Sequence, residues 1–489
     1  MWLCSVVKGD YLKMKIVNPV RGISASRLPK FCGARTPLSI VGVLGQLVFF
    51  LNPGVAQTLE EALANAYLSN PGLQAARAEL RATDETVSQA ISGWRPNVEF
   101  SVSGGLDRID SQSGSTGDSG SSGDRTLLKP RSAEISVEQN IFKGGQIIAE
   151  VKQREFAVLA ERAELSEIEQ EVLLDAATAF MNVVRDQAVV DLQKNSEIVL
   201  LRQLEATRDR FSVGEVTRTD VSLSEARLAR AKADRIQAEG NLENSRTSFV
   251  RIVGMSPAKL KAPNLKYNLP ESLEIAVTAA SKDNPKVISS LYWRKVAEQN
   301  VKKITGELLP KLSLEGSIRK SEDETSRNST REDASIIATL KIPLYQRGAV
   351  MSRVREAKQQ AAQRRLQYDD KRRVVVEATR RAWEDLGTAR ARIDAFKIAI
   401  KSSEIALEGV RQEADVGSRT VLDVLDAEQE LLDGQVNLVR AQRDEFVAAT
   451  ELASAVGNLT AKEYSLEVDY YDKTTHYNKV RDKFYGLGK

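Results

Sequence analysis

Residues 146–212 read QIIAEVKQREFAVLAERAELSEIEQEVLLDAATAFMNVVRDQAVVDLQKNSEIVLLRQLEATRDRFS, a stretch of 67 residues without proline. Apolar side chains recur along it every seven residues, at Val151, Val158, Leu165, Val172 and Ala179. A seven-residue apolar repeat keeps one seam facing a neighbouring helix, so the stretch predicts a single long helix with coiled-coil-like packing. At the α-helical rise per residue, this helix spans about 100 Å.

The stretches on either side of the long helix have a matching total length. Residues 59–92 and about 217–252 also show helical patterns, and Asn70-Pro71 interrupts the first of them. Because they hold 34 and 36 residues, two shorter helices stacked end to end match the long helix beside them. The composition agrees, since 28% charged and only 6% aromatic residues favour extended helices over compact α/β domains.

The chain carries this pattern twice. Leu59-Glu60 to Asn70-Pro71 matches Leu273-Glu274 to Asn284-Pro285 at an offset of 214 residues, and the later matches have an offset of 203. The change of register falls at the Ser/Gly-rich residues 111–123, which predict a flexible polar loop. A repeat of about 200 residues indicates a duplicated domain. We place the two copies at residues 57–272 and 273–457, followed by a tail at 458–489. The second copy repeats the seven-residue pattern at Val354, Ala361, Tyr368, Val375 and Ala382.

Between the helical stretches of each copy, apolar and polar residues alternate. Pro96 and Pro310 end the preceding helices, because proline lacks a backbone N–H and disfavours the helical conformation before it. Alternation is typical of strands, and each segment is near the length of a membrane-spanning strand. A half-buried soluble hairpin is the alternative for any single segment. The apolar positions are Val98, Phe100, Val102, Ile135 and Val137 in the first copy, and Leu312, Leu314, Ile318, Ile336, Ala338, Leu340 and Ile342 in the second.

The N-terminal residues 1–56 have the pattern of a secretory signal peptide. Seven basic residues and one acid precede the uncharged apolar run from Leu38 to Leu51, and a small-residue site follows at Ala56. The run is shorter than a spanning helix, which is the alternative; Met14 is a second candidate start. Removal of this segment takes away both cysteines and changes the net charge from +3 to −3, which disfavours a nucleic-acid partner.

Four strands cannot close a barrel, and an open sheet edge is not tolerated in lipid. If the strands span a membrane, several chains must share the barrel. Two chains would form eight strands, nearly filled by their own side chains, whereas three would form twelve and leave a lumen. The alternative class is a soluble periplasmic coiled-coil scaffold or adaptor protein.

The chain resembles outer-membrane efflux and secretion channels of the TolC type. The resemblance runs from Thr58-Leu59-Glu60-Glu61-Ala62 to Val456-Gly457 and includes the duplication, the Asn-Pro turns, the prolines at the strand entries and the two Val-Gly turns. It implies a mostly α fold with a membrane β-barrel: a duplicated strand-strand-long-helix-helix unit whose homotrimer forms a 12-stranded barrel and an α-helical periplasmic tunnel. The implied location is the outer membrane, extending into the periplasm.

The resemblance also implies the function and the partners. We expect a passive exit duct of a tripartite efflux pump or a type I secretion system, in contact with outer-membrane lipid. Its protein partners would be a periplasmic adaptor (membrane fusion protein) and an inner-membrane pump or ABC transporter. The adaptor would contact the hairpin tips at Val213-Gly214 and Val416-Gly417. The tail would lie around the waist of the tunnel or be partly disordered.

The candidate gate residues lie beside these turns. Asp423 and Asp426 share one helix face, and around a threefold axis they would form carboxylate rings that attract cations; a solvated acidic helix face is the alternative. Arg419 matches a family arginine that latches the closed entrance to a neighbouring hairpin, where Thr219 and Asp220 match the partner positions. A tyrosine of the family pattern is replaced by Ala414, which removes one hydrogen bond of that latch.

The sequence does not favour catalysis. Its single histidine, His476, and its two cysteines are too few for a His-rich metal site or a Ser-His-Asp triad. No phosphate-binding motif is present. We therefore expect no enzyme activity, no cofactor and no metal.

Overall fold

The structure, a computed structural model, describes residues 57–486 apart from 112–123, 259, 262 and 264–268. The chain divides into two units, Met1–Pro53 and Gly54–Lys489, and all the described elements belong to the second. The expected signal peptide at 1–56 and all but the first residue of the expected loop at 111–123 lie outside the described residues.

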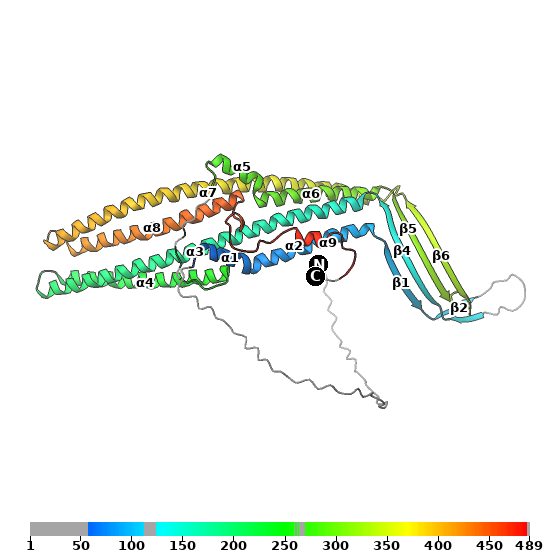
Figure 1. The fold of residues 1–489 in the computed structure, drawn as a ribbon. Coiled ribbons are helices and arrows are strands. Elements are labelled where there is room, and N and C mark those ends of the chain that lie inside the picture. Colours follow the sequence, from blue (N-terminus) through cyan, green and yellow to red (C-terminus); the bar gives the residue numbers. More distant parts are fainter. Residues whose placement is uncertain (1–56, 112–123, 259, 262, 264–268, 487–489) are drawn as a thin grey trace, which may run out of the picture. The chain divides into compact units, whose positions relative to one another are not determined.

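The order of helices and strands is the same in both copies, apart from one additional hairpin in the first (Figure 1). The first copy comprises α1 (Leu59–Ser69), α2 (Pro71–Ile91), the short 3-10 helix η1 (Ser92–Trp94), β1 (Asn97–Gly104), β2 (Asp107–Ser111), β3 (Asp124–Leu128), β4 (Arg131–Lys143), α3 (Gln146–Ser212) and α4 (Arg218–Val253). The second comprises α5 (Leu273–Asp283), α6 (Pro285–Thr305), η2 (Gly306–Leu308), β5 (Lys311–Glu322), β6 (Thr330–Lys341), α7 (Ala349–Asp415) and α8 (Val421–Val456). Helix α9 (Thr475–Val480) lies in the tail. The domain limits after 272 and 457 stay predictions.

The predicted long helix is confirmed, because α3 spans residues 146–212 and α7 also has 67 residues. The Asn-Pro pairs make the junctions between the short helices. The Asn70 side chain accepts hydrogen bonds from the N–H groups of Gly72 and Leu73, at 2.9 and 3.2 Å, and Pro71 occupies the first helical position, where an N–H is not needed. Asn284 accepts from Lys286 in the same way. Each Asn-Pro pair therefore ends one short helix and starts the next, and both helices remain part of the bundle.

The two long helices differ in how deeply they are buried. Helix α3 has its main contacts with α1, α2, α4, α6 and α8, whereas the main contacts of α7 are with α5, α6 and α8. Four of the five predicted seam residues of α3 are buried, from Val158 to Ala179, but only Val375 and Ala382 are buried on α7. The seven-residue repeat thus identifies an apolar seam on both long helices. The number of helices packed against each one decides how many of its seam residues are buried within one chain.

The predicted strands form a four-stranded antiparallel sheet in the order β1-β4-β5-β6. Its register brings the alternating residues into rows: Phe100 lies opposite Ile135, and Ile135 lies opposite Ile318. One face is therefore apolar and exposed to solvent in the single chain. On the other face, serines of neighbouring strands form hydrogen bonds, 2.8 Å between the Ser103 and Ser132 hydroxyls.

The sequence did not predict one hairpin of the first copy. Strands β2 and β3 pair as a separate antiparallel ribbon on either side of residues 112–123, and the second copy has no counterpart among its described residues. The segment Asp107–Ser111 reads DRIDS, which has no apolar alternation and therefore no strand signal.

None of the helices in the described part of the chain is both long and apolar enough to cross a membrane.

Candidate functional site

The turns that join α3 to α4 and α7 to α8 have the same backbone geometry. Gly214 and Gly417 have φ values of 82° and 78°, and a helix that ends in this way favours glycine. The N–H of Gly214 donates to the carbonyl of Phe211 at 3.0 Å, and that of Gly417 donates to Ala414 at 3.1 Å. Apart from the adjacent residues, no described residue has an atom within 4 Å of the place where a Cβ would stand on either glycine, and Val213 and Val416 are exposed at the tips.

After each turn, a threonine and an aspartate form a reciprocal cap on the next helix. The Asp423 carboxylate accepts from the N–H and the hydroxyl of Thr420, at 2.9 and 2.7 Å, while the N–H of Asp423 donates to the Thr420 hydroxyl. Asp220 and Thr217 repeat this arrangement on α4, so Thr217 is the cap of that helix. The hydrogen bonds from Thr420 hold the pKa of the Asp423 carboxyl below its usual value. Asp423 is therefore ionised and held in place.

Asp426 connects the two hairpins. Its carboxylate lies 2.5 Å from the guanidinium of Arg227 on α4, and it remains more than half exposed. A charge-assisted pair of this kind is directional, although exposure to water limits its strength. Asp423 and Asp426 do lie one turn apart at the start of α8, but within one chain each already has a partner.

Arg419 also has a partner in its own hairpin. Its Nε donates to Glu413 Oε2 at 2.8 Å, and this contact raises the pKa of Arg419 above its already high value. Thr219 is exposed, and the Asp220 carboxylate accepts from Thr217. In the described part of this single chain, Arg419 therefore does not pair with either predicted partner. The predicted latch to a neighbouring hairpin stays a prediction, and Glu413 is the residue with which a neighbour would have to compete.

Sequence reasoning missed a duplicated ion pair above the turns. Arg208 pairs with Glu225 at 2.6 Å, and Arg411 pairs with Glu428. Each residue of the second pair lies 203 residues after its counterpart in the first, so the repeat offset could have predicted one pair from the other. A small apolar cluster then joins both hairpins: Leu200, Leu204, Leu228, Ala231, Val421 and Leu425. The hairpin end is thus braced within each chain by both charge and packing.

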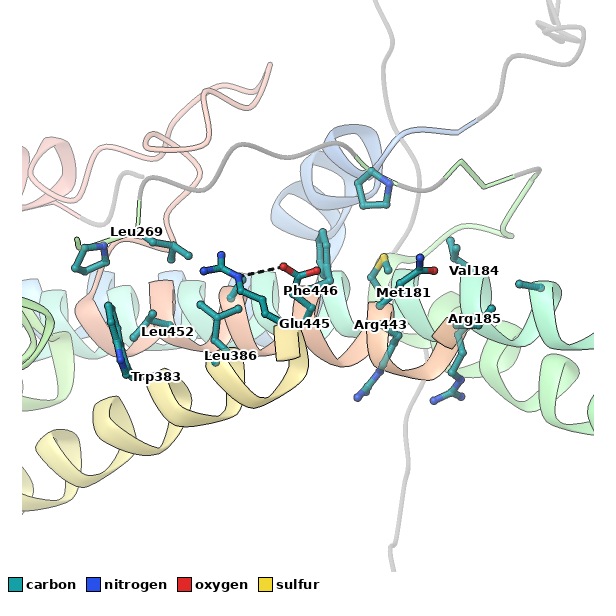
Figure 2. A pocket seen from close by; sticks show the side chains of 18 residues that line it. Met181, Val184, Arg185, Leu269, Trp383, Leu386, Arg443, Glu445, Phe446 and Leu452 are labelled. Atoms are coloured by element: carbon teal, nitrogen blue, oxygen red, sulfur yellow. Dashed lines mark hydrogen bonds and ion pairs between the residues drawn. The ribbon is translucent and has the colours of Figure 1, made fainter. Parts of the chain in front are cut away.

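A pocket of about 790 Å³ lies farther along the helices, between α3, α7, α8 and the residues that precede α5 (Figure 2). Its apolar wall includes Trp383, Leu386 and Leu452. The arginines at its edge have partners within the chain, as in the 3.2 Å contact between Arg390 and Glu445. We find no group of three His, Cys, Asp or Glu side chains that would hold a metal ion among the residues described.

Comparison with known proteins identifies matches along nearly all of the described chain. The family model described as outer membrane efflux protein matches residues 61–255 and 277–458. The outer membrane efflux protein BepC of Brucella suis is 33% identical over 436 residues, covering 88% of this chain and 92% of that protein. The outer membrane protein TolC of Vibrio cholerae is 27% identical, covering 87% and 96%. Among solved structures, the Campylobacter jejuni CmeC outer membrane channel superposes with a TM-score of 0.73 at 16% identity, covering 93% and 98%.

Proposed function

This chain belongs to the outer membrane efflux protein family, and we propose from that membership that three copies of it form one channel. The family consists of transport channels of the outer membrane, with a periplasmic part built from long helices. The proposal concerns what lies beyond that: the number of chains, the gate and the partners.

One observation supports an assembly of three chains. Among the described strands, β1 and β6 are the two edges of the four-stranded sheet, and its apolar face is bare; Ile336 is 81% exposed. Apolar side chains in this amount suit lipid, but lipid does not tolerate unpaired strand edges. Pairing of β6 with β1 of the next chain removes both edges. Three chains make twelve strands with a lumen, whereas the eight strands of two chains leave no duct.

The helices support the same arrangement. Helix α7, which has its main contacts with fewer helices than α3, exposes Ile398 and Ile405. These two residues lie seven positions apart and so share one face of the helix. On α4, Ile236 is also exposed. A neighbouring chain that covers these side chains would extend the strand barrel into a helical tunnel.

The gate would lie where the hairpin turns converge. Three copies of Asp423 and Asp426 would place carboxylates around the axis, which favours cations. Arg419 would leave Glu413 for the Thr219-Asp220 region of a neighbour when the entrance closes. The exposed tips at Val213-Gly214 and Val416-Gly417 would then receive the periplasmic adaptor, which connects the channel to an inner-membrane pump or ABC transporter.

Fractionation tests the proposal against the soluble scaffold. We expect the chain in the outer-membrane fraction, as a trimer that migrates intact in mild detergent and dissociates on heating. A soluble periplasmic species would contradict the membrane channel. A membrane-bound dimer would contradict only the number of chains.

A further inference from the structure

The tail after α8 follows a defined path along the first copy. Leu459, Ala461 and Leu466 are buried in the main apolar core with α1, α3 and α4. From there the N–H of Tyr471 donates to the Tyr67 hydroxyl at 3.0 Å, and α9 packs against α2 (Figure 1). The tail therefore leaves the middle of the bundle, where the resemblance placed it, and continues along it.

Successive contacts with α3 show the direction of this path. Lys473 contacts Ser166, and eight residues later Arg481 contacts Glu155 at 3.1 Å. Because α3 begins at Gln146, directly after β4, falling residue numbers on α3 lead towards the strands. Between these contacts, the imidazole of His476 lies 3.1 Å from Asp84, whose side chain is buried on α2. The tail thus runs as a strap from the middle of the bundle to the base of the sheet.

The last described residues of the strap meet the entry of β1. Arg95, two residues before β1, donates from Nη1 to the carbonyl of Lys483 at 2.8 Å, and its guanidinium lies 5.2 Å from the centre of the Phe484 ring. The hydroxyl of Ser88 donates to the same carbonyl at 3.4 Å. These contacts hold the backbone of the strap against the chain, yet they leave its aromatic side chains outside.

Phe484 is 71% exposed and Tyr485 is 89% exposed. Phe484 contacts Arg95, which lies three residues before Val98, where the bare apolar face of the sheet begins. Trp94, directly before Arg95, is also exposed. Phenylalanine, tyrosine and tryptophan next to basic side chains suit the headgroup level of a bilayer, where an aromatic ring meets lipid and a cation meets phosphate.

The second copy supplies a matching surface without any tail. The connection from β6 to α7 exposes Leu344 and Tyr345, next to Lys341 and Arg347. Both copies therefore present apolar and basic residues together at the helix-side ends of their strands.

We propose that Phe484 and Tyr485 form a membrane anchor that inserts into the periplasmic leaflet of the outer membrane, with Arg95 and the strap holding it at the level of the lipid phosphates. The occupant of this surface is the phospholipid headgroup region. The inference rests on the proposed function, because it requires the sheet to span the same membrane. Its consequence is that the tail fixes the depth of the channel in the bilayer instead of encircling the tunnel.

Spin labels on the whole channel test this directly. The described residues contain no cysteine, and Cys4→Ser with Cys32→Ser removes both native thiols. In that background, Tyr485→Cys carries a nitroxide at the anchor, Tyr470→Cys carries one on the same tail away from the strands, and Phe100→Cys carries one on the apolar face. The channel is placed in nanodiscs of phosphatidylethanolamine and phosphatidylglycerol, and collisions with oxygen and with a water-soluble nickel complex are compared.

We expect the ratio of oxygen to nickel collisions to be several-fold higher at position 485 than at position 470, and high at position 100. A water-like ratio at 485 overturns the anchor, as does shielding from both reagents, which would mean that a neighbouring chain covers it. In either case a high ratio at 100 leaves the membrane channel standing. A water-like ratio at 100 refutes the membrane sheet and the anchor together.

Discussion

An arginine on the apolar face of the sheet should prevent assembly of the channel, whereas the same residue one position along should not. Phe100 lies in a row with Ile135 and Ile318, and its ring is exposed on the face that we assign to lipid. Ser101 points to the opposite face, where its register partner is Glu134. Phe100→Arg therefore places a cation in hydrocarbon, and Ser101→Arg places it beside a carboxylate.

The expected cost follows from the position and the number of chains. A lipid-facing arginine costs about 2–4 kcal/mol near the middle of the bilayer and less towards its surfaces. Three chains carry three copies, so the trimer loses up to about 6–12 kcal/mol. That is comparable to the whole free energy of unfolding of an ordinary domain, about 5–15 kcal/mol. Ser101→Arg gains a partner and should cost little.

The assay is the amount of heat-dissociable trimer in the outer-membrane fraction, measured for both variants at equal expression. We expect little or no trimer for Phe100→Arg and nearly normal amounts for Ser101→Arg. Equal damage from both substitutions would show that the faces are misassigned or that the sheet does not meet lipid.

Three further outcomes concern the tunnel. Asp423→Ala with Asp426→Ala should shift the reversal potential towards anion selectivity and weaken block by polyvalent cations. Asp423→Asn with Asp426→Asn should do the same while keeping hydrogen-bond acceptors for the helix cap. Unchanged selectivity would show that these acids form only a solvated helix face. Arg419→Ala should raise single-channel conductance without loss of cation preference, and unchanged conductance would refute the latch. Burial, with Glu164 and Glu79 nearby, raises the pKa of Glu161 from 4.5 to about 7. Between these values the folded state holds a proton that the unfolded chain has lost, so stability should fall as pH rises through this window. Glu161→Gln should reduce that slope in thermal unfolding, and an unaltered slope would show that other groups cause it.

The long helices could be predicted from local sequence because their limits are set locally. Proline is absent from 146–212, the Asn70-Pro71 junction caps itself, and Gly214 sets the turn. The faces of the strands were predictable for a similar reason, since alternation alone assigns Phe100 and Ser101 to opposite sides.

The partners of the gate residues were not predictable in this way. The pair Arg227–Asp426 joins residues 199 positions apart, and no periodicity reports which arginine of α4 meets which acid of α8. For Arg419, Glu413 competes from within the same hairpin, six residues earlier in the chain. The path of the tail towards the strands was not predicted, because its contacts, such as His476 with Asp84, are single long-range contacts without a repeating pattern.

Single-channel recording of the purified protein in planar bilayers tests the central claim most directly. A trimeric duct with carboxylates at its narrow periplasmic end should produce discrete conductance steps that prefer cations, and polyvalent cations should block them from the periplasmic side only. Absence of conductance from a properly inserted trimer, or block that is equal from both sides, would contradict a duct gated at the hairpin turns.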